Sequence, residues 1–188
     1  MENFQVTDKI WDEVQPLTVS QSTELEALDN LFERIAQRSI DEDWQEPDTP
    51  ENLEEKKAEL SEEAEYVNFI PVNSLLGEAI CKFNSVDNTS LDEVNRLAQA
   101  MNFNTVVVDM RDLGMATNTD VPQYAFAYAS TYPYPTEDER PSLIAGHYGQ
   151  DEQLEKQFLD FCNGGDNLAQ IQERENREQT HDDPGMSR

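Results

Sequence analysis

The sequence predicts an α+β fold in which N-terminal acidic helices are followed by a small two- to three-stranded sheet packed with helices. Hydrophobic residues recur at helical spacing through much of the first hundred residues, and the pattern then changes to short β-branched and alternating aromatic runs. The apolar fraction is 37%, below the roughly 45–50% of typical globular domains. This low fraction indicates that part of the chain lies outside the core.

The first predicted helix covers residues 23–39. Residues 1–21 show no clear period, and we expect an irregular or extended arm there. Thr23 and Glu26 then match a capping box, in which each side chain accepts a hydrogen bond from the backbone of the other. The apolar residues of this segment recur on one helical face and predict a core-facing stripe: Leu25, Leu28, Leu31, Phe32 and Ile35.

A second predicted helix begins at Pro50. Pro47 and Pro50 interrupt the preceding helix, and Thr49 before Pro50 is a typical N-cap followed by proline at the first helical position. We expect this helix to extend to residue 67 and to be mostly solvated, because its apolar stripe is narrow. The stripe consists of Leu53, Leu60, Ala64 and Val67.

Two further helices are predicted over residues 72–83 and 90–101, both with apolar faces wide enough to be buried. The first tolerates Gly77 in its middle. The second begins with a capping box formed by Ser90 and Glu93. We expect both helices to pack on the core.

Strands are predicted over residues 105–108 and 124–132, with a third at 142–145. A helix follows from Asp151 and ends at Gly164-Gly165, and a weak helix from about residue 167 leads into a polar tail. The expected organisation is therefore an acidic, mostly helical arm or subdomain at 1–70, an α+β core at 71–165, and a weak helix with a C-terminal tail at 166–188.

The second strand separates aromatic from small residues. Tyr124, Phe126, Tyr128 and Tyr132 fall on one face, and Ala125, Ala127 and Ala129 fall on the other. The alanine face permits close helix packing. The tyrosine face fits either a core surface or a stacking platform for a ring-bearing ligand, and we favour the core surface.

The most distinctive property is a net charge of −27, which is concentrated in residues 41–65. This block contains twelve Asp or Glu and two Lys, a net −10. Helical throughout, it would span about 37 Å, with one net charge per roughly 4 Å. A DNA strand carries one phosphate per about 3.4 Å.

This comparison favours an acidic segment that binds a basic, nucleic-acid-binding surface of another protein. Two other interpretations remain open: a solvated face or flexible linker that keeps the protein soluble, and a generally acidic surface of the kind that halophilic proteins carry. Trp44 lies within the acidic run, and an aromatic residue among charges fits an interface anchor or, equally, a residue that fills the core. The predicted partner-binding residues are Asp41, Glu42, Asp43, Trp44, Glu46, Asp48, Glu51, Glu54, Glu55, Glu59, Glu62, Glu63 and Glu65.

Several function classes are disfavoured. The negative charge should repel nucleic acid and anionic membranes. No phosphate-binding or nucleophile motif occurs, and the two histidines belong to no metal-binding pattern, so we expect neither catalysis nor a cofactor or metal. No signal peptide or membrane span is visible, and Cys81 and Cys162 lie in helical patterns that suit buried thiols. We expect a soluble, cytoplasmic protein.

The function predicted from the sequence is a non-enzymatic, acidic protein-binding module that inhibits a nucleic-acid-handling partner by DNA mimicry, as anti-defence proteins do. The alternative is a structural or assembly adaptor, or a chaperone-like subunit, whose acidity is only solubilising. Salt discriminates between them, because screening weakens contacts between charges and leaves apolar docking intact.

Overall fold

The computed structural model describes residues 15–18, 26–43, 45–101, 105–112, 124–130 and 152–181. They form an α+β fold, as the sequence predicts. In chain order the elements are β1 (Gln15–Thr18), α3 (Glu26–Glu42), α4 (Pro50–Glu63), β2 (Tyr66–Pro71), α5 (Leu75–Phe83), α6 (Leu91–Ala100), β3 (Thr105–Asp109), β4 (Tyr124–Ser130), α8 (Glu152–Cys162) and α9 (Leu168–His181).

The described strands form one antiparallel sheet in the order β1-β2-β4-β3. Successive side chains of a strand point to opposite faces, so β2, β3 and β4 each contribute to two cores. Phe69 and its partner Ala127 belong to the core cluster on one face. Val107 and its partner Phe126 belong to the cluster on the other face. The sheet is therefore buried on both sides.

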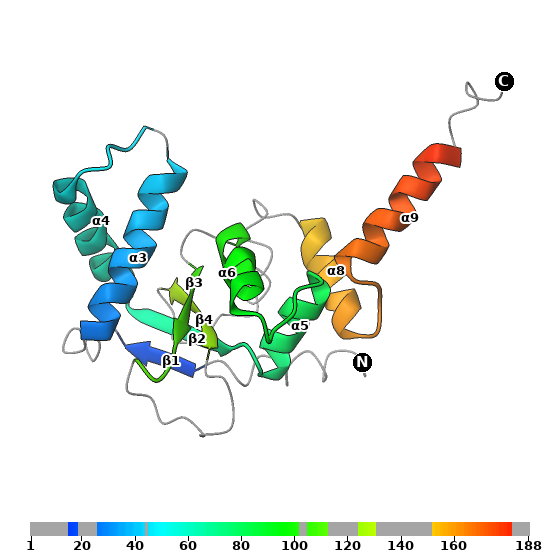
Figure 1. The fold of residues 1–188 in the computed structure, drawn as a ribbon, viewed down its shortest axis with the longest axis horizontal. Helices are drawn as coiled ribbons and strands as arrows, with labels where there is room; N and C mark the ends of the chain where they lie inside the picture. Colours follow the sequence, from blue (N-terminus) through cyan, green and yellow to red (C-terminus); the bar gives the residue numbers. More distant parts are fainter. Residues whose placement is uncertain are drawn as a thin grey trace.

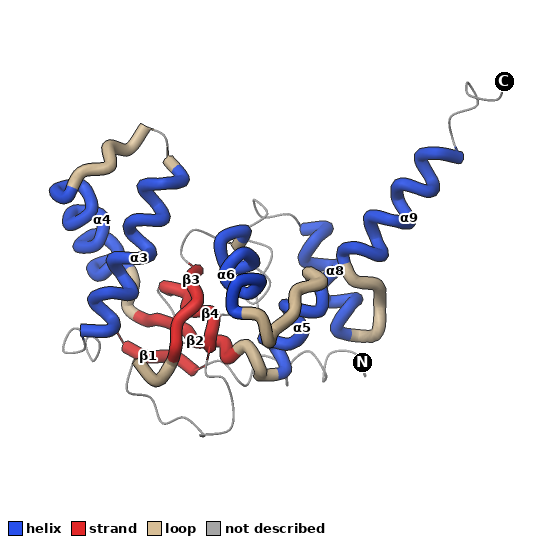
Figure 2. Tube along the Cα trace, viewed as in Figure 1, coloured by secondary structure: helices blue, strands red, loops and turns tan. Residues whose placement is uncertain are grey.

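Helices cover the two faces in separate layers. The α3–α4 pair lies on one side of the sheet, and α5, α6 and α8 lie on the other (Figure 1). The tube view shows the strands between these two groups of helices (Figure 2). Three residues of the expected stripe of α3, Leu31, Phe32 and Ile35, pack on the alanine face. Leu25 and the side chain of Leu28 lie outside the described part of the chain. The opposite layer contributes Leu76, Ile80, Val94, Leu97 and Phe158.

The sequence predicts no strand at β2, and β1 lies in the segment expected to be an irregular or extended arm. Gln15–Thr18 pairs with β2, although residues 1–21 show no period in the sequence. The second helix ends at Glu63 rather than at residue 67, and Val67 lies in β2, where it is buried. The physical reason is that β2 lies between β1 and β4, where its consecutive buried residues are covered on both faces of the sheet. The boundary expected between residues 70 and 71 lies within this strand.

Gly77 is required by the approach of α5 to the end of β2. A Cβ atom at this position would lie 2.0 Å from the carbonyl oxygen of Pro71. Ser74 caps the helix by accepting a hydrogen bond from the backbone N–H of Gly77 at 3.0 Å. The glycine therefore gives α5 its close contact with the backbone that follows the strand.

The C-terminal helices follow the predicted pattern. α8 ends in a Schellman motif, with Gly164 at a φ of +96° and the N–H of Gly165 donating to the carbonyl of Asp160 at 2.8 Å. α9 packs on the core through buried Ile171 and then extends away from the body with exposed side chains (Figure 1). The third strand expected at 142–145 lies outside the described residues, as do residues 131 and 132 of the second.

Candidate functional site

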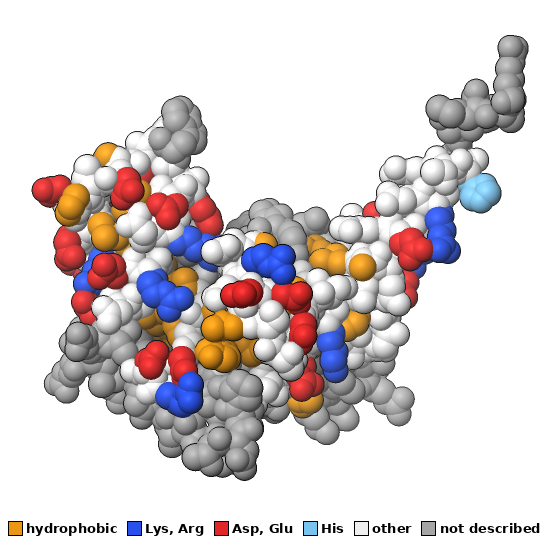
Figure 3. All heavy atoms as spheres, viewed as in Figure 1, with side chains coloured by type: hydrophobic (Ala, Val, Ile, Leu, Met, Phe, Trp, Pro, Cys, Tyr) orange, Lys and Arg blue, Asp and Glu red, His pale blue; other side chains and the backbone are white. Residues whose placement is uncertain are grey.

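The predicted acidic block forms the exposed edge of a helical hairpin. It covers the end of α3, the loop to α4, the whole of α4 and the turn into β2. Glu46 is half-buried, and the other described acids of the block are exposed: Asp41, Glu42, Asp43, Asp48, Glu51, Glu54, Glu55, Glu59, Glu62, Glu63 and Glu65. Trp44 lies outside the described residues. In the space-filling view, acidic side chains gather over α4 (Figure 3).

The hairpin loop is held by hydrogen bonds to the start of α4. Thr49 is the N-cap, as predicted, and its Oγ1 accepts from the backbone N–H of Asn52 at 3.2 Å. The Nδ2 of Asn52 donates to Glu46 Oε2 at 3.1 Å and to the carbonyl of Pro47 at 2.9 Å. These bonds fix the direction in which α4 leaves the loop.

Both lysines of α4 are engaged with acids elsewhere in the hairpin. Lys57 Nζ lies 2.6 Å from Asp29 Oδ2 on α3, and Lys56 Nζ lies 3.2 Å from Glu46 Oε1 in the loop. The hydrogen bond to Asp29 raises the pKa of Lys57, and the hydrogen bond to Glu46 raises that of Lys56. Lys56 also approaches Glu59 at 3.9 Å. The lysines thus stabilise the hairpin and leave the outer surface of α4 acidic.

The spacing of these charges can now be compared with that of a nucleic-acid backbone. The prolines interrupt the block, so it does not form one long helical rod. The 14 residues of α4 span about 21 Å and carry six exposed glutamates, which is one per roughly 3.5 Å. The phosphate spacing of one DNA strand is about 3.4 Å. Counted as carboxylates alone, the linear density of α4 is therefore close to that of one DNA strand, and with Lys56 and Lys57 included its net charge of −4 gives one charge per roughly 5 Å.

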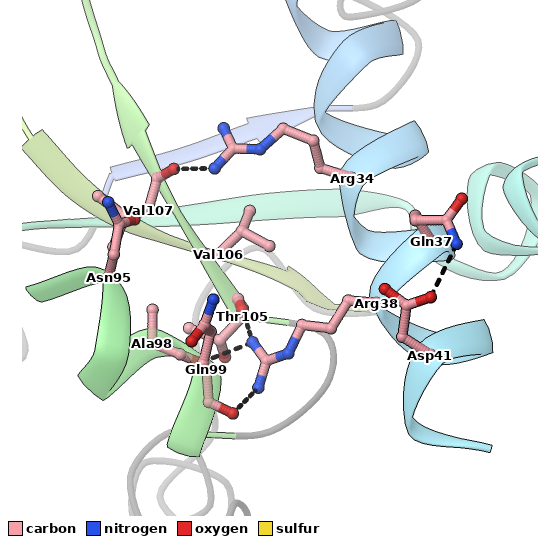
Figure 4. Close-up of a pocket in the computed structure, with 10 residues that line it drawn as sticks. All are labelled: Arg34, Gln37, Arg38, Asp41, Asn95, Ala98, Gln99, Thr105, Val106 and Val107. Atoms are coloured by element: carbon pink, nitrogen blue, oxygen red, sulfur yellow. Dashed lines mark hydrogen bonds between the residues drawn. The ribbon is translucent and has the colours of Figure 1, made fainter. Parts of the chain in front are cut away.

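Arg38 connects the hairpin to the opposite layer (Figure 4). Its five N–H donors meet five acceptors. Nε donates to Glu42 Oε1 at 2.9 Å, and the other donors reach the carbonyls of Ala98 at 2.6 Å, Gln99 at 2.5 Å, Met101 at 2.7 Å and Thr105. Three of these carbonyls belong to the C-terminal end of α6, where helical carbonyls lack intrahelical partners and a cation is favourable.

Arg34 lies one turn earlier on α3 and bonds to the edge of the sheet. Its Nη2 donates to the carbonyl of Val107 at 2.6 Å, and burial lowers its pKa. Arg34 and Arg38 border a pocket of about 290 Å³ between α3, α6 and β3. The sequence prediction missed both arginines. One signal was present: Arg38 follows Leu31 and Ile35 at i+7 and i+3, in line with the apolar stripe.

Other candidate groups have structural roles or fall outside the site. Tyr124 and Tyr128 are half-buried and pack against the core beside Phe126. Burial raises the pKa of the Cys81 thiol to about 12 and that of Cys162 to about 11, so neither is a reactive thiolate near neutral pH. Within the described ranges, no three His, Cys, Asp or Glu residues are placed to hold a metal ion, and no helix has the length and apolar character needed to cross a membrane.

Comparison of the chain with protein-family models, with curated protein sequences and with solved structures finds no match. Function is therefore argued from the site itself. Its two distinctive features are the exposed glutamates of α4, with both lysines engaged elsewhere in the hairpin, and the pocket beside the two arginines of α3.

Proposed function

We propose that the α3–α4 hairpin is an acidic docking element that occupies a basic, nucleic-acid-binding surface of another protein. The chain would then act as a DNA-mimic-like inhibitor, as anti-defence proteins do, without catalysis of its own. The observation that carries this proposal is the acidic face of α4, where six exposed glutamates give an average of one carboxylate per roughly 3.5 Å of helix, close to the linear density of phosphates in a DNA strand. Electrostatic steering toward a basic surface is the expected consequence.

The rigidity of the hairpin supports this proposal over a flexible acidic linker. Lys57 ties α4 to Asp29 on α3, and Asn52 fixes the loop. Arg38 ties α3 to α6 and β3. A partner therefore meets carboxylates on an ordered helix, which lowers the entropy lost on binding.

The adaptor hypothesis receives less support from the structure. It would use an apolar stripe of α4 such as Leu53 and Leu60 to dock on a partner. Leu60 packs against the core cluster beneath α3, and Leu53 is half-buried. The net charge of −27 also fits a cytoplasmic protein that makes no direct contact with nucleic acid or membranes.

The test compares two variants that lose the same charge at different places. The first replaces Glu54, Glu55 and Glu62 on α4 with Gln, and the second replaces Glu173, Glu175 and Glu178 on α9 with Gln; all six residues are exposed. Each immobilised variant and the wild type are exposed to an extract of the native cell at physiological salt. Bound proteins are released with double-stranded DNA and quantified.

We expect DNA to release a nucleic-acid-binding protein from the wild type and from the α9 variant, with much less bound to the α4 variant. High salt should release the same protein. Equal capture by the α4 variant would refute the proposal. Equal loss from both variants would show that total charge, rather than the α4 face, determines binding, and would refute it as well.

A further inference from the structure

The pocket beside Arg34 has a different electrostatic character from the rest of the molecule. It lies between α3, α6 and the edge strand β3, and its volume is about 290 Å³ (Figure 4). Its lining contains the guanidinium groups of Arg34 and Arg38 and one carboxylate, that of Asp41. The lining is therefore locally positive in a chain with a net charge of −27.

Arg34 is the cation of the pocket that has unused hydrogen-bond donors. All five N–H donors of Arg38 are used, and Asp41 Oδ1 accepts from Gln37 Nε2 at 2.9 Å. Arg34 makes one hydrogen bond within the described part of the chain, to the carbonyl of Val107, and forms no salt bridge there. By contrast, eight other described Lys or Arg residues form salt bridges with carboxylates: Arg38, Lys56, Lys57, Lys82, Arg96, Arg111, Arg174 and Arg177.

Other donors converge on the same space. β3 is an edge strand, and the bond from Arg34 shows that the carbonyl of Val107 points away from β4. In an antiparallel ladder the N–H of a residue points to the same side as its carbonyl, so the N–H of Val107 also faces this edge. The side-chain amides of Asn95 and Gln99 complete the polar lining on the side of α6.

We propose that this pocket binds a small, singly charged organic carboxylate through the guanidinium of Arg34. The planar guanidinium fork matches a carboxylate in bidentate geometry. The volume lies near the lower end of the range for ligand pockets, which selects a small molecule. The acidic field of the chain disfavours a multiply charged anion such as phosphate more strongly than a monoanion. The pocket shares Asp41 with the acidic block but contains no residue of α4, whose glutamates carry the proposed function.

The experiment titrates the ¹⁵N-labelled full chain with butyrate, with its neutral analogue butyramide and with inorganic phosphate. Backbone and side-chain amide shifts are followed for Val107, Asn95 and Arg34. Butyrate should cause saturable shifts at these groups with millimolar affinity, and butyramide and phosphate should bind at least tenfold more weakly. Arg34→Gln should weaken butyrate binding roughly ten- to hundredfold, as expected for the loss of a charge-assisted pair.

The matched control is Arg96→Gln, which removes an exposed arginine of α6 that pairs with Glu93 outside the pocket lining. It should bind butyrate as the wild type does. Arg34→Lys keeps the charge without the fork and should bind with intermediate affinity, which tests the site even if Arg34→Gln is unstable. The proposal is overturned if butyrate causes no saturable shift, if butyramide or phosphate binds equally well, or if folded Arg34 variants retain wild-type affinity.

Discussion

Replacement of Arg38 by Met should destabilise the fold more than any other single change of a charged residue in the hairpin. Methionine keeps the aliphatic stem and removes the guanidinium. Three of the five lost hydrogen bonds reach carbonyls in part-buried surroundings, those of Ala98, Met101 and Thr105. At about 1 kcal/mol for each lost hydrogen bond, the expected cost is about 3 kcal/mol.

The other two bonds of Arg38 add little to this figure. The bond to Gln99 and the ion pair with Glu42 are exposed to solvent, where water replaces the lost partner. We therefore expect Glu42→Gln to change the free energy of unfolding by less than about 1 kcal/mol. Arg34→Met removes one bond and should cost about 1 kcal/mol.

Urea unfolding followed by far-ultraviolet circular dichroism measures these differences. With a slope of about 2 kcal/mol per M, Arg38→Met should lower the midpoint by about 1.5 M, and Arg34→Met by about 0.5 M. Amide hydrogen exchange should accelerate at the end of α6 and in β3, which the guanidinium connects to α3. If the midpoint of Arg38→Met falls no further than that of Glu42→Gln, the assigned role of Arg38 is wrong.

Three further predictions concern single sites. Gly77→Ala should lower the free energy of unfolding by roughly 2–4 kcal/mol, because the added Cβ would lie 2.0 Å from the carbonyl oxygen of Pro71. Helix propensity alone predicts the opposite, a gain in stability. The direction of the change in melting temperature distinguishes the two. Thr105→Val should stabilise by about 1 kcal/mol, since the buried Oγ1 has no hydrogen-bond partner among the described residues; an unchanged or lower urea midpoint would contradict this. Burial raises the pKa of Cys81 to about 12, above its pKa in the unfolded chain. The neutral thiol therefore contributes its full stability below the unfolded pKa, and this contribution is lost as the pH rises through the pKa of the folded state. Cys81→Val should flatten the decline in melting temperature at alkaline pH.

Local sequence patterns predicted most of the helices because their buried faces are periodic. Leu31 and Ile35 face the sheet as their spacing requires, and the Thr49 and Ser90 caps begin α4 and α6. The alternation in β4 likewise predicted that its alanines would allow close packing, and Ala127 lies beneath α3 in the same cluster as Leu31. In each case the residues whose pattern predicts the element all lie within that element.

The missed features depend on residues far apart in the chain. β2 is buried on both faces, so it lacks the alternation that identifies a half-buried strand, and its first residues continue the helical spacing of α4. Arg38 finds its four carbonyl acceptors 60 to 67 residues further along the chain, which no local pattern of charges reveals. The pocket is likewise formed by residues of α3, α6 and β3 together.

This separation also sets an order for folding during synthesis. α3 and α4 leave the ribosome before β2, β3 and β4 and contact each other locally, but the sheet face on which α3 packs includes Ala127, which emerges much later. The carbonyl that Arg34 binds lies 73 residues downstream. We expect the nascent hairpin to form early and dock late, after β4 has paired with β2. Electrostatic repulsion between its carboxylates and the phosphates of ribosomal RNA would keep the two apart during that interval.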